Sequence, residues 1–246
     1  MINLWRSLYA RLSRKVLHHP GDMHFEPSVI CSPDGIKPSN FLIEIALKAI
    51  AIAQGNCIDF EATAPDDARY FNIFPGEHYR LLKAMMKAIN PSRVVEIGTF
   101  TGMGSFAVRQ GLETGRLVTF DILPWHSFET HLTQRDFANG MVTQILSDLS
   151  DEKEFQQHFP LLDEADVIFL DAPKDGRFEY RMMDKLRRLS PRPDRLLILD
   201  DIRFVNMVEL WRGIRSPKLD VTSFGHWSGT GLVDLSQPLE FSAVGR

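Results

Sequence analysis

The stretch RVVEIGTFTGMG, residues 93–104, decides how this chain folds. Its first five residues are mostly apolar and include two adjacent valines, which is typical of a buried β-strand. The glycines that follow predict a tight turn, and residues 103–112 then form a helix. A glycine-rich turn between a strand and a helix lets a ligand approach the backbone, where amide groups can bind its polar atoms.

The alternation of strand and helix continues to the end of the chain. Further apolar strands are predicted at residues 116–122, 141–146, 166–171 and 195–201. Helices are predicted at residues 127–138, 151–158, 176–189 and 204–214. Residues 219–245 predict two antiparallel strands around a turn at residues 228–231. The pattern indicates an α/β fold, a Rossmann-like, doubly wound, mostly parallel seven-stranded sheet with a C-terminal antiparallel hairpin.

The residues before this alternation read as helices and loops. Residues 3–17 have leucines at helical spacing and basic residues largely on the other side, which predicts a basic amphipathic helix. Two more helices are predicted, from Ser39 or Asn40 to about residue 54 and at residues 77–89. We therefore expect a helical extension over residues 1–75, as a cap over the site or a contact in a homodimer, and a cofactor-binding domain over residues 76–246.

Composition excludes several classes of protein. The chain has 246 residues, a net charge of −4 and two cysteines, so it is neither a basic nucleic-acid binder nor a disulfide scaffold. The longest apolar stretch, at residues 41–53, contains Glu44 and Lys48 and is too short to span a bilayer. Basic residues interrupt the N-terminus, which therefore does not resemble a secretory signal. The expected location is the cytoplasm.

Acidic side chains follow every predicted parallel strand. In a doubly wound sheet, ligands bind outside the carboxyl ends of the strands. One or two of these acidic residues, such as Asp148 or the pair Asp200–Asp201, could simply cap the helices that follow the strands. Helix capping is a poor explanation for an acidic residue at every strand end. The residues at the strand ends are Glu96, Gly98, Asp121, Ser147, Asp148, Asp171, Asp200 and Asp201.

Two cofactor classes use a loop like that at residues 96–105. The string Gly102-x-Gly104-x-x-Ala107 satisfies the dinucleotide fingerprint, but its first glycine does not directly follow the strand. The pattern E-x-G-x-x-x-G-x-G, beginning at Glu96, resembles the first motif of class I S-adenosylmethionine-dependent methyltransferases. The resemblance implies that S-adenosylmethionine binds along the loop and the next strand ends. The residues expected to bind it are Glu96, Gly98, Thr99, Phe100, Gly102, Ser105, Asp121, Ser147, Asp148 and Asp171.

A second constellation follows the fourth and fifth strands. Adjacent parallel strands lie about 5 Å apart, so Asp171, Asp200 and Asp201 can converge on one hard cation. Carboxylate oxygens of this kind suit Mg²⁺ or another divalent cation. Lys174, three residues after Asp171, would reach over the same site, although a solvated loop lysine is the alternative interpretation.

This constellation resembles the catechol O-methyltransferase branch of the class I enzymes and related sugar O-methyltransferases of natural-product pathways. The resemblance covers roughly residues 70–210 and includes Asn72. It implies that Asp171, Asp200 and Asp201 bind Mg²⁺ and that Lys174 is the general base. The chain differs from the catechol enzymes in having Asp201 instead of asparagine and in both terminal regions. A catechol substrate is therefore not implied.

We interpret the chain as an enzyme, an S-adenosylmethionine-dependent, Mg-dependent O-methyltransferase. Its acceptor would be a small molecule with neighbouring oxygens, such as a catechol, a sugar or another diol. A methyltransferase without a metal is one alternative, and an NAD-dependent oxidoreductase is a weaker one. A non-catalytic cofactor-binding protein would need neither Asp171 nor Lys174. We interpret His226 and Trp227 as ordinary sheet residues of the last hairpin, with a role in the pocket as the alternative. Trp125 is interpreted as an adenine contact or surface cover.

Overall fold

The computed structural model describes residues 35–55, 58–59, 71–72, 78–204 and 207–242. The chain divides into two compact units, Met1–Gly35 and Ile36–Arg246. The predicted helix at residues 3–17 lies outside the described residues. So does the predicted boundary after residue 75, which falls within residues 73–77. The fold described below is that of the second unit.

A seven-stranded sheet forms the centre of this unit, with the order β3-β2-β1-β4-β5-β7-β6. The five strands β1 to β5 pair in parallel, whereas β7 pairs antiparallel with both β5 and β6. The predicted fold class is confirmed. The strands are β1 (Arg93–Ile97), β2 (Arg116–Asp121), β3 (Val142–Leu146), β4 (Val167–Leu170), β5 (Leu196–Asp200), β6 (Lys218–Asp220) and β7 (Thr230–Asp234).

The strand register brings the predicted site residues to one edge of the sheet. Ile97, the last residue of β1, lies opposite Phe120 in β2 and Leu170 in β4. Leu170 in turn lies opposite Leu199 in β5. The residues that follow these positions therefore emerge together. The strand order reverses between β1 and β4, which is where open α/β sheets bind their ligands.

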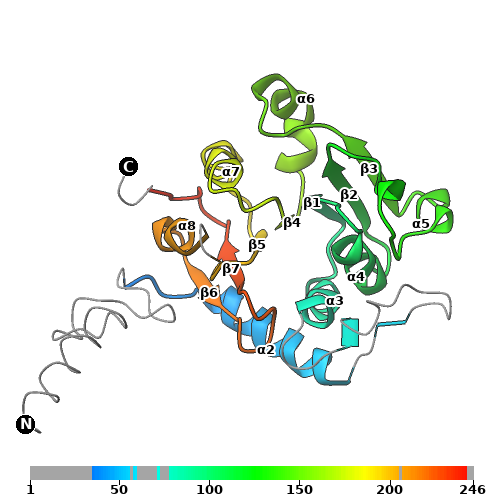
Figure 1. The fold of residues 1–246 in the computed structure, drawn as a ribbon. Helices are drawn as coiled ribbons and strands as arrows, with labels where there is room; N and C mark the ends of the chain where they lie inside the picture. Colours follow the sequence, from blue (N-terminus) through cyan, green and yellow to red (C-terminus); the bar gives the residue numbers. More distant parts are fainter. Residues whose placement is uncertain (1–34, 56–57, 60–70, 73–77, 205–206, 243–246) are drawn as a thin grey trace, which may run out of the picture. The chain divides into compact units, whose positions relative to one another are not determined.

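Helices cover both faces of the sheet (Figure 1). One hydrophobic cluster joins the sheet to α2 (Asn40–Gly55), α3 (His78–Ile89) and α4 (Met103–Gly111). A second cluster joins the opposite face to α6 (Glu152–Asp163), α7 (Phe178–Leu186) and α8 (Met207–Gly213). The sheet is thus buried on both sides, as its nearly continuous apolar strands predict.

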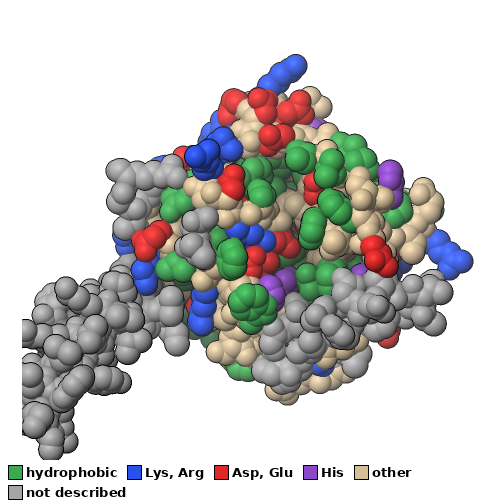
Figure 2. Space-filling view, in the orientation of Figure 1, with side chains coloured by type: hydrophobic (Ala, Val, Ile, Leu, Met, Phe, Trp, Pro, Cys, Tyr) green, Lys and Arg blue, Asp and Glu red, His purple; other side chains and the backbone are tan. Residues whose placement is uncertain are grey.

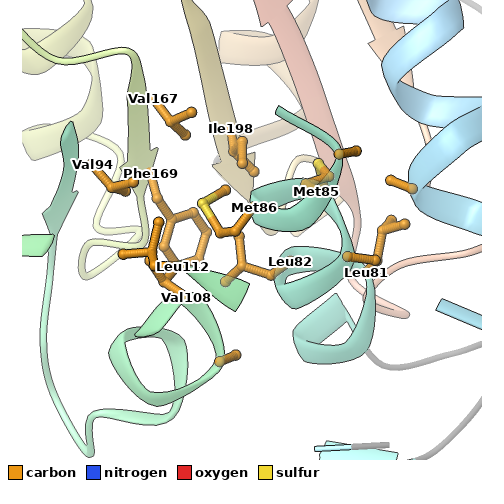
Figure 3. Packing of buried hydrophobic residues seen from close by; sticks show 14 of the residues in the cluster. Leu81, Leu82, Met85, Met86, Val94, Val108, Leu112, Val167, Phe169 and Ile198 are labelled. Atoms are coloured by element: carbon orange, nitrogen blue, oxygen red, sulfur yellow. The ribbon is translucent and has the colours of Figure 1, made fainter. Parts of the chain in front are cut away.

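Alternation along each strand sends successive side chains to opposite faces. In β1, Val94 belongs to the cluster with α3, and Val95 belongs to the cluster on the other face. The helix α3 places Leu82 and Met86 beside Phe169 of β4 (Figure 3). By the same alternation, Asp200 follows Ile198 on the α3 face. This positions the carboxylate of Asp200 near the start of α3.

The second and third helices have different packing patterns. In α2 the buried side chains are Leu42, Ala46, Ala49 and Ala53, which form one helical stripe. Most of α3 is buried, including Arg80 and Lys83. Burial of a leucine-sized side chain contributes about 1.5–3 kcal/mol, so α3 is an integral layer of the fold rather than an appendage.

The prediction of one helix over residues 127–138 was wrong. The structure has a short 3₁₀ helix, Trp125–Ser127, and a separate α5, Gln134–Ala138. Thr133 and Asp136 form a capping box, with the Asp136 carboxylate accepting a hydrogen bond from the Thr133 backbone N–H at 2.7 Å. Because these side chains define a helix start, the segment before them cannot continue as one helix.

The predicted hairpin turn at residues 228–231 was also misplaced. Thr230 and Gly231 belong to β7, and the connection from β6 runs through residues 221–229. Gly229 has a φ of +116°, and a Cβ there would lie 2.7 Å from the backbone nitrogen of Arg203. This close approach holds the connection against the end of β5. Among the described residues, no helix is long and apolar enough to cross a membrane.

Candidate functional site

A pocket of about 250 Å³ opens at the carboxyl ends of β1, β2 and β4. Of the residues predicted to bind a cofactor, the pocket is lined by Gly98, Asp121, Ser147 and Asp148. It also contains Phe178 and Arg181 of α7, which the sequence analysis missed. No motif marks these two positions, since they reach the pocket only through the packing of α7 beside β4.

Gly98 is required by the close approach of two backbones. Its φ is +105°, and a Cβ at this position would lie 1.9 Å from the carbonyl oxygen of Asp171. The Gly98 amide donates a hydrogen bond to the carbonyl of Phe120 at 2.9 Å. The glycine therefore lets the ends of three neighbouring strands meet at one wall of the pocket.

The carboxylate of Asp121 organises the glycine loop. Its Oδ2 accepts hydrogen bonds from the backbone amides of Thr99 at 2.9 Å and Phe100 at 2.8 Å. Its Oδ1 accepts one from the amide of Leu123 at 3.0 Å. Gln144 of β3 supports the same loop, because its Nε2 donates to the hydroxyl of Thr99 at 3.1 Å. The Asp121 carboxylate is thus held at the pocket wall.

Ser147 and Asp148 follow β3 at the far side of the pocket. The Ser147 hydroxyl donates to Glu154 at 2.8 Å, whereas the exposed Asp148 accepts from the Ser150 amide at 2.8 Å. The alternative role of Asp148 as the cap of the next helix is wrong. Asp151 caps α6, accepting from the amides of residues 153 and 154.

Glu96 and Ser105 lie beneath the loop rather than along the pocket. The hydroxyl of Ser105 donates to the carboxylate of Glu96, and both side chains are fully buried. A Cβ at Gly104 would lie 2.5 Å from Oε1 of Glu96. Burial raises the pKa of Glu96 to about 8, and the hydrogen bond from Ser105 opposes this rise. The pair supports the loop from beneath and lies outside the residues that line the pocket, so its predicted contact with a cofactor stays a prediction.

The remaining loop residues lie outside the residues that line the pocket. Gly102 has a φ of +76° at the start of α4, where a Cβ would meet Leu132 at 2.5 Å. Phe100 is exposed, and its ring contacts that of Phe128 at 4.9 Å. Their predicted contacts with a cofactor stay predictions. Trp125 stacks on Phe137 at 4.9 Å and takes no part in the pocket lining.

A cluster of carboxylates lies next to the pocket. One oxygen from each of Asp171, Asp200 and Asp201 lies within 4.8 Å of the others. The ammonium of Lys174 contacts Asp171, lies 2.9 Å from Asp201 and lies 3.5 Å from Asp200. Acidic, basic and histidine side chains meet near the middle of the face shown in Figure 2. The structure thus brings together the four residues that the sequence predicted as one constellation.

Local backbone geometry presents Lys174 to the carboxylates. Lys174 and Asp201 have φ values of +57° and +58°, which non-glycine residues rarely adopt. The backbone amide of Lys174 donates to the buried carboxylate of Glu179 at 2.6 Å. The turn after β4 is thereby tied to the start of α7. The side chain of Lys174 is 14% exposed, so it is held in the cluster rather than solvated.

The three carboxylates and Lys174 shift one another's pKa values. Burial alone would lower the pKa of Lys174, but the attraction of the three carboxylates raises it above its usual value. Burial, together with the charge of Asp200, raises the pKa of Asp171 to about 7. Burial would raise the pKa of Asp200, but its interactions with His78, His226 and Lys174 lower it. In this state the ammonium of Lys174 offsets part of the negative charge of the cluster.

Two histidines complete the surroundings of the site. His78 was not recognised from the sequence, whereas a role in the pocket was the alternative interpretation of His226. His226 lies in the connection before β7, not in a sheet strand as we interpreted it, and its Nδ1 is 3.4 Å from Asp200 and 3.3 Å from Asp201. His78, the first residue of α3, is buried with its Nδ1 3.6 Å from Asp200. Burial lowers the pKa of His78 to about 4. His78 and His226 lie far apart in the sequence, so no short motif could indicate that they lie together in the fold.

The alternative role of the pair Asp200–Asp201 as a helix cap is wrong, since α8 begins at Met207 and not near residue 203. The side chain of Asn72, which the resemblance includes, bonds the backbone of Ile58, accepting at 2.8 Å and donating at 3.3 Å. Trp227 is 74% exposed and lies beside His226.

Comparison with known proteins places this geometry in context. Residues 95–202 match the family model described as a methyltransferase domain. A search of curated proteins finds no match.

Solved structures similar to the chain include cofactor-bound Rv0187 from MTB, with 19% identity over 78% of this chain and 90% of that chain and a TM-score of 0.47. The SAH-bound methyltransferase PaMTH1 from Podospora anserina has 16% identity over 79% of this chain and 88% of that chain, with a TM-score of 0.46. An O-methyltransferase from Bacillus cereus in complex with SAH has 19% identity over 95% of this chain and 100% of that chain, with a TM-score of 0.43.

The match to the family model spans β1, the glycine loop, the pocket and the strand ends that carry the carboxylates. It agrees with the seven-stranded sheet and with the motif that begins at Glu96. Residues 95–202 of this chain are therefore similar to a methyltransferase domain.

Proposed function

We propose that the protein transfers the methyl group of S-adenosylmethionine to an oxygen of a small molecule that carries neighbouring oxygen atoms. A divalent cation, such as Mg²⁺, would be held by Asp171, Asp200 and Asp201, and Lys174 would be the general base. The observation that carries the proposal is the meeting of these four side chains beside the pocket at the ends of β1 and β4.

The pocket fits the proposed cofactor. S-adenosylmethionine supplies an electrophilic methyl group when it is bound. Oδ1 of Asp121 at the pocket wall accepts one backbone hydrogen bond, from Leu123, so its second acceptor position can take a ribose hydroxyl. Asp148 is exposed at the pocket edge and can accept from an adenine amino group. Gly98 leaves the backbone open for close approach of the ligand.

The carboxylate cluster fits a divalent cation. Three carboxylates within 4.8 Å carry more negative charge than the single ammonium of Lys174 offsets. Oxygen ligands at the ends of two adjacent, rigid strands suit Mg²⁺, which also keeps waters and substrate oxygens. When bound, the cation supplies a Lewis acid for a substrate hydroxyl and added positive charge for its surroundings.

Lys174 needs such added charge to act as a base. The three carboxylates raise its pKa, so Lys174 is protonated in the state described here. Neutralisation of Asp171, Asp200 and Asp201 removes that effect, and the burial of Lys174 then favours its neutral form. A neutral Lys174 can accept a proton from a substrate hydroxyl that lies against the cluster.

A methyltransferase that uses no metal is the second candidate. It is favoured by the contacts of Lys174, whose ammonium already neutralises part of the carboxylate charge. In that case Asp171 or Asp201 would bind the acceptor hydroxyls directly. The two candidates differ in the protonation state of Lys174, which is neutral in the first and cationic in the second.

Substitution of Lys174 tests the proposal. Lys174→Ala should lower methyl transfer by about 10²–10⁴-fold, the usual contribution of a general base. Lys174→Arg should fail as well, because arginine retains its proton. Both variants should still bind S-adenosylhomocysteine in calorimetry, because Asp121 and Gly98 are unchanged. Full activity of Lys174→Arg would contradict the base role and favour the metal-free candidate.

A further inference from the structure

We propose that His78, Asp200 and His226 form a second cation site, one that takes a transition-metal ion such as Co²⁺, Zn²⁺, Mn²⁺ or Fe²⁺. It adjoins the carboxylate cluster and shares Asp200 with it. The inference goes beyond the proposed function, since it concerns nitrogen ligands that methyl transfer does not require. It stands whether or not the protein methylates an oxygen.

The two oxygens of Asp200 face different groups. Oδ2 lies 3.5 Å from the ammonium of Lys174, within the carboxylate cluster. Oδ1 lies 3.6 Å from Nδ1 of His78 and 3.4 Å from Nδ1 of His226. The ligand atoms of the three residues all lie within 4.8 Å of one another. Asp200 therefore separates an all-oxygen site from a site with two nitrogens and one oxygen.

These separations match those across a small metal centre. Ligands at about 2.0–2.1 Å from a tetrahedral cation lie about 3.4 Å apart. Two imidazoles and one carboxylate are the ligand set of many zinc and non-haem iron sites, with open positions left for water or substrate. Mg²⁺ prefers oxygen ligands, so the histidines distinguish the new site from the carboxylate cluster.

The three ligands come from different, well-anchored segments. His78 begins α3 and is 2% exposed, and Asp200 ends β5 and is 4% exposed. His226 lies in the connection before β7, which Gly229 holds against Arg203. The two histidine rings meet edge to face with their centroids 4.8 Å apart. Such anchoring keeps the ligand atoms close at little further entropic cost when a cation binds.

A neighbouring hydroxyl limits the form of His226 that can bind. The hydroxyl of Ser228 lies 2.8 Å from Nδ1 of His226 and also contacts Asp201. For Nδ1 to become a ligand, its proton must reside on Nε2 instead. Ser228 then keeps its bond to Asp201. The change is a shift of tautomer, with no net loss of a proton from a neutral imidazole.

Titration of the full-length, metal-stripped protein with Co²⁺ tests the site, because visible absorption reports the cobalt ligands directly. We expect the wild-type protein to bind Co²⁺ with a spectrum typical of nitrogen ligation. His226→Ala should weaken that binding by at least about 10–100-fold, since even loss of a group that only hydrogen-bonds to a metal ligand has this effect. Asp171→Asn should retain the spectrum, because Asp171 belongs only to the carboxylate cluster.

A matched control and a clear contrary outcome complete the test. His126→Ala removes an exposed histidine away from the site and should leave Co²⁺ binding unchanged. Absence of Co²⁺ binding, or binding that survives His226→Ala and is lost in Asp171→Asn, would overturn the proposal. Because the readout is spectroscopic, failure of methyl transfer in the same preparation would bear only on the proposed function.

Discussion

Glu96 should make the folded protein less stable as pH rises. The side chain is fully buried, and burial raises its pKa from 4.5 to about 8, against the opposing hydrogen bond from Ser105. Between those two values the folded protein holds a proton that the unfolded chain releases. The stabilising contribution is therefore complete below about pH 4.5 and is lost as pH rises through about 8.

The size of the effect follows from the two pKa values. One pKa unit corresponds to about 1.4 kcal/mol of differential stability. The interval from 4.5 to about 8 then gives a loss of about 5 kcal/mol across the window. Glu96→Gln keeps a side chain of the same shape that can still accept from Ser105 but carries no titrating proton. The variant should therefore lack this part of the pH dependence.

Urea unfolding at a series of pH values from about 5 to about 8.5 measures the effect. The difference between the wild-type protein and Glu96→Gln should grow with pH, with the variant the more stable at high pH. Comparison of the two proteins cancels the titration of distant groups. Glu113→Gln, at an exposed position, is the matched control and should follow the wild type. Parallel stability curves for the wild type and Glu96→Gln would refute the reasoning.

Three further predictions concern the pocket and the chain terminus. Asp121→Ala should weaken S-adenosylhomocysteine binding by about 1.5–3 kcal/mol, the contribution of hydrogen bonds to a charged group, and unchanged affinity in calorimetry would contradict its placement. Gly98→Ala should destabilise the fold by at least about 2 kcal/mol, because the new Cβ would overlap the Asp171 carbonyl. Gly140→Ala, which has a φ of +70° and open space around it, should lose less in the same urea assay, and equal losses would argue against the overlap. We propose that the N-terminal residues serve the acceptor side or a dimer. Removal of residues 1–35 should reduce acceptor turnover or molecular mass in solution more than it weakens S-adenosylhomocysteine binding, whereas unchanged turnover and mass would contradict this role.

The sheet and its ligand edge could be predicted because their signals are local. The strand at residues 93–97 has the predicted bounds, because its apolar run ends directly before Gly98. A glycine is needed there because the backbone of Asp171 approaches it closely. Asp171, Asp200 and Asp201 meet as predicted because parallel strands end at one edge. The prediction of a helix over residues 127–138 was wrong, because the capping box of Thr133 and Asp136 starts the helix at Gln134, within that segment.

The contacts of His78 and His226 with Asp200 could not be predicted from the sequence, because they depend on tertiary packing alone. His78 reaches Asp200 through the packing of α3 on the sheet, and His226 reaches it through a connection whose length the sequence did not reveal. For Glu96 the motif could be recognised from the sequence, but the position of its side chain could not. Only the structure shows that the carboxylate lies beneath the loop, against Gly104 and Ser105.

The most direct test of the account is methyl transfer from methyl-labelled S-adenosylmethionine to a small vicinal diol, measured with and without a chelator. We predict that excess chelator abolishes the transfer and that Mg²⁺ or Mn²⁺ restores it, while S-adenosylhomocysteine binding persists throughout. The cation would be needed because only its charge offsets the carboxylates that keep Lys174 protonated. Transfer at the full rate in chelator would contradict the metal-dependent mechanism.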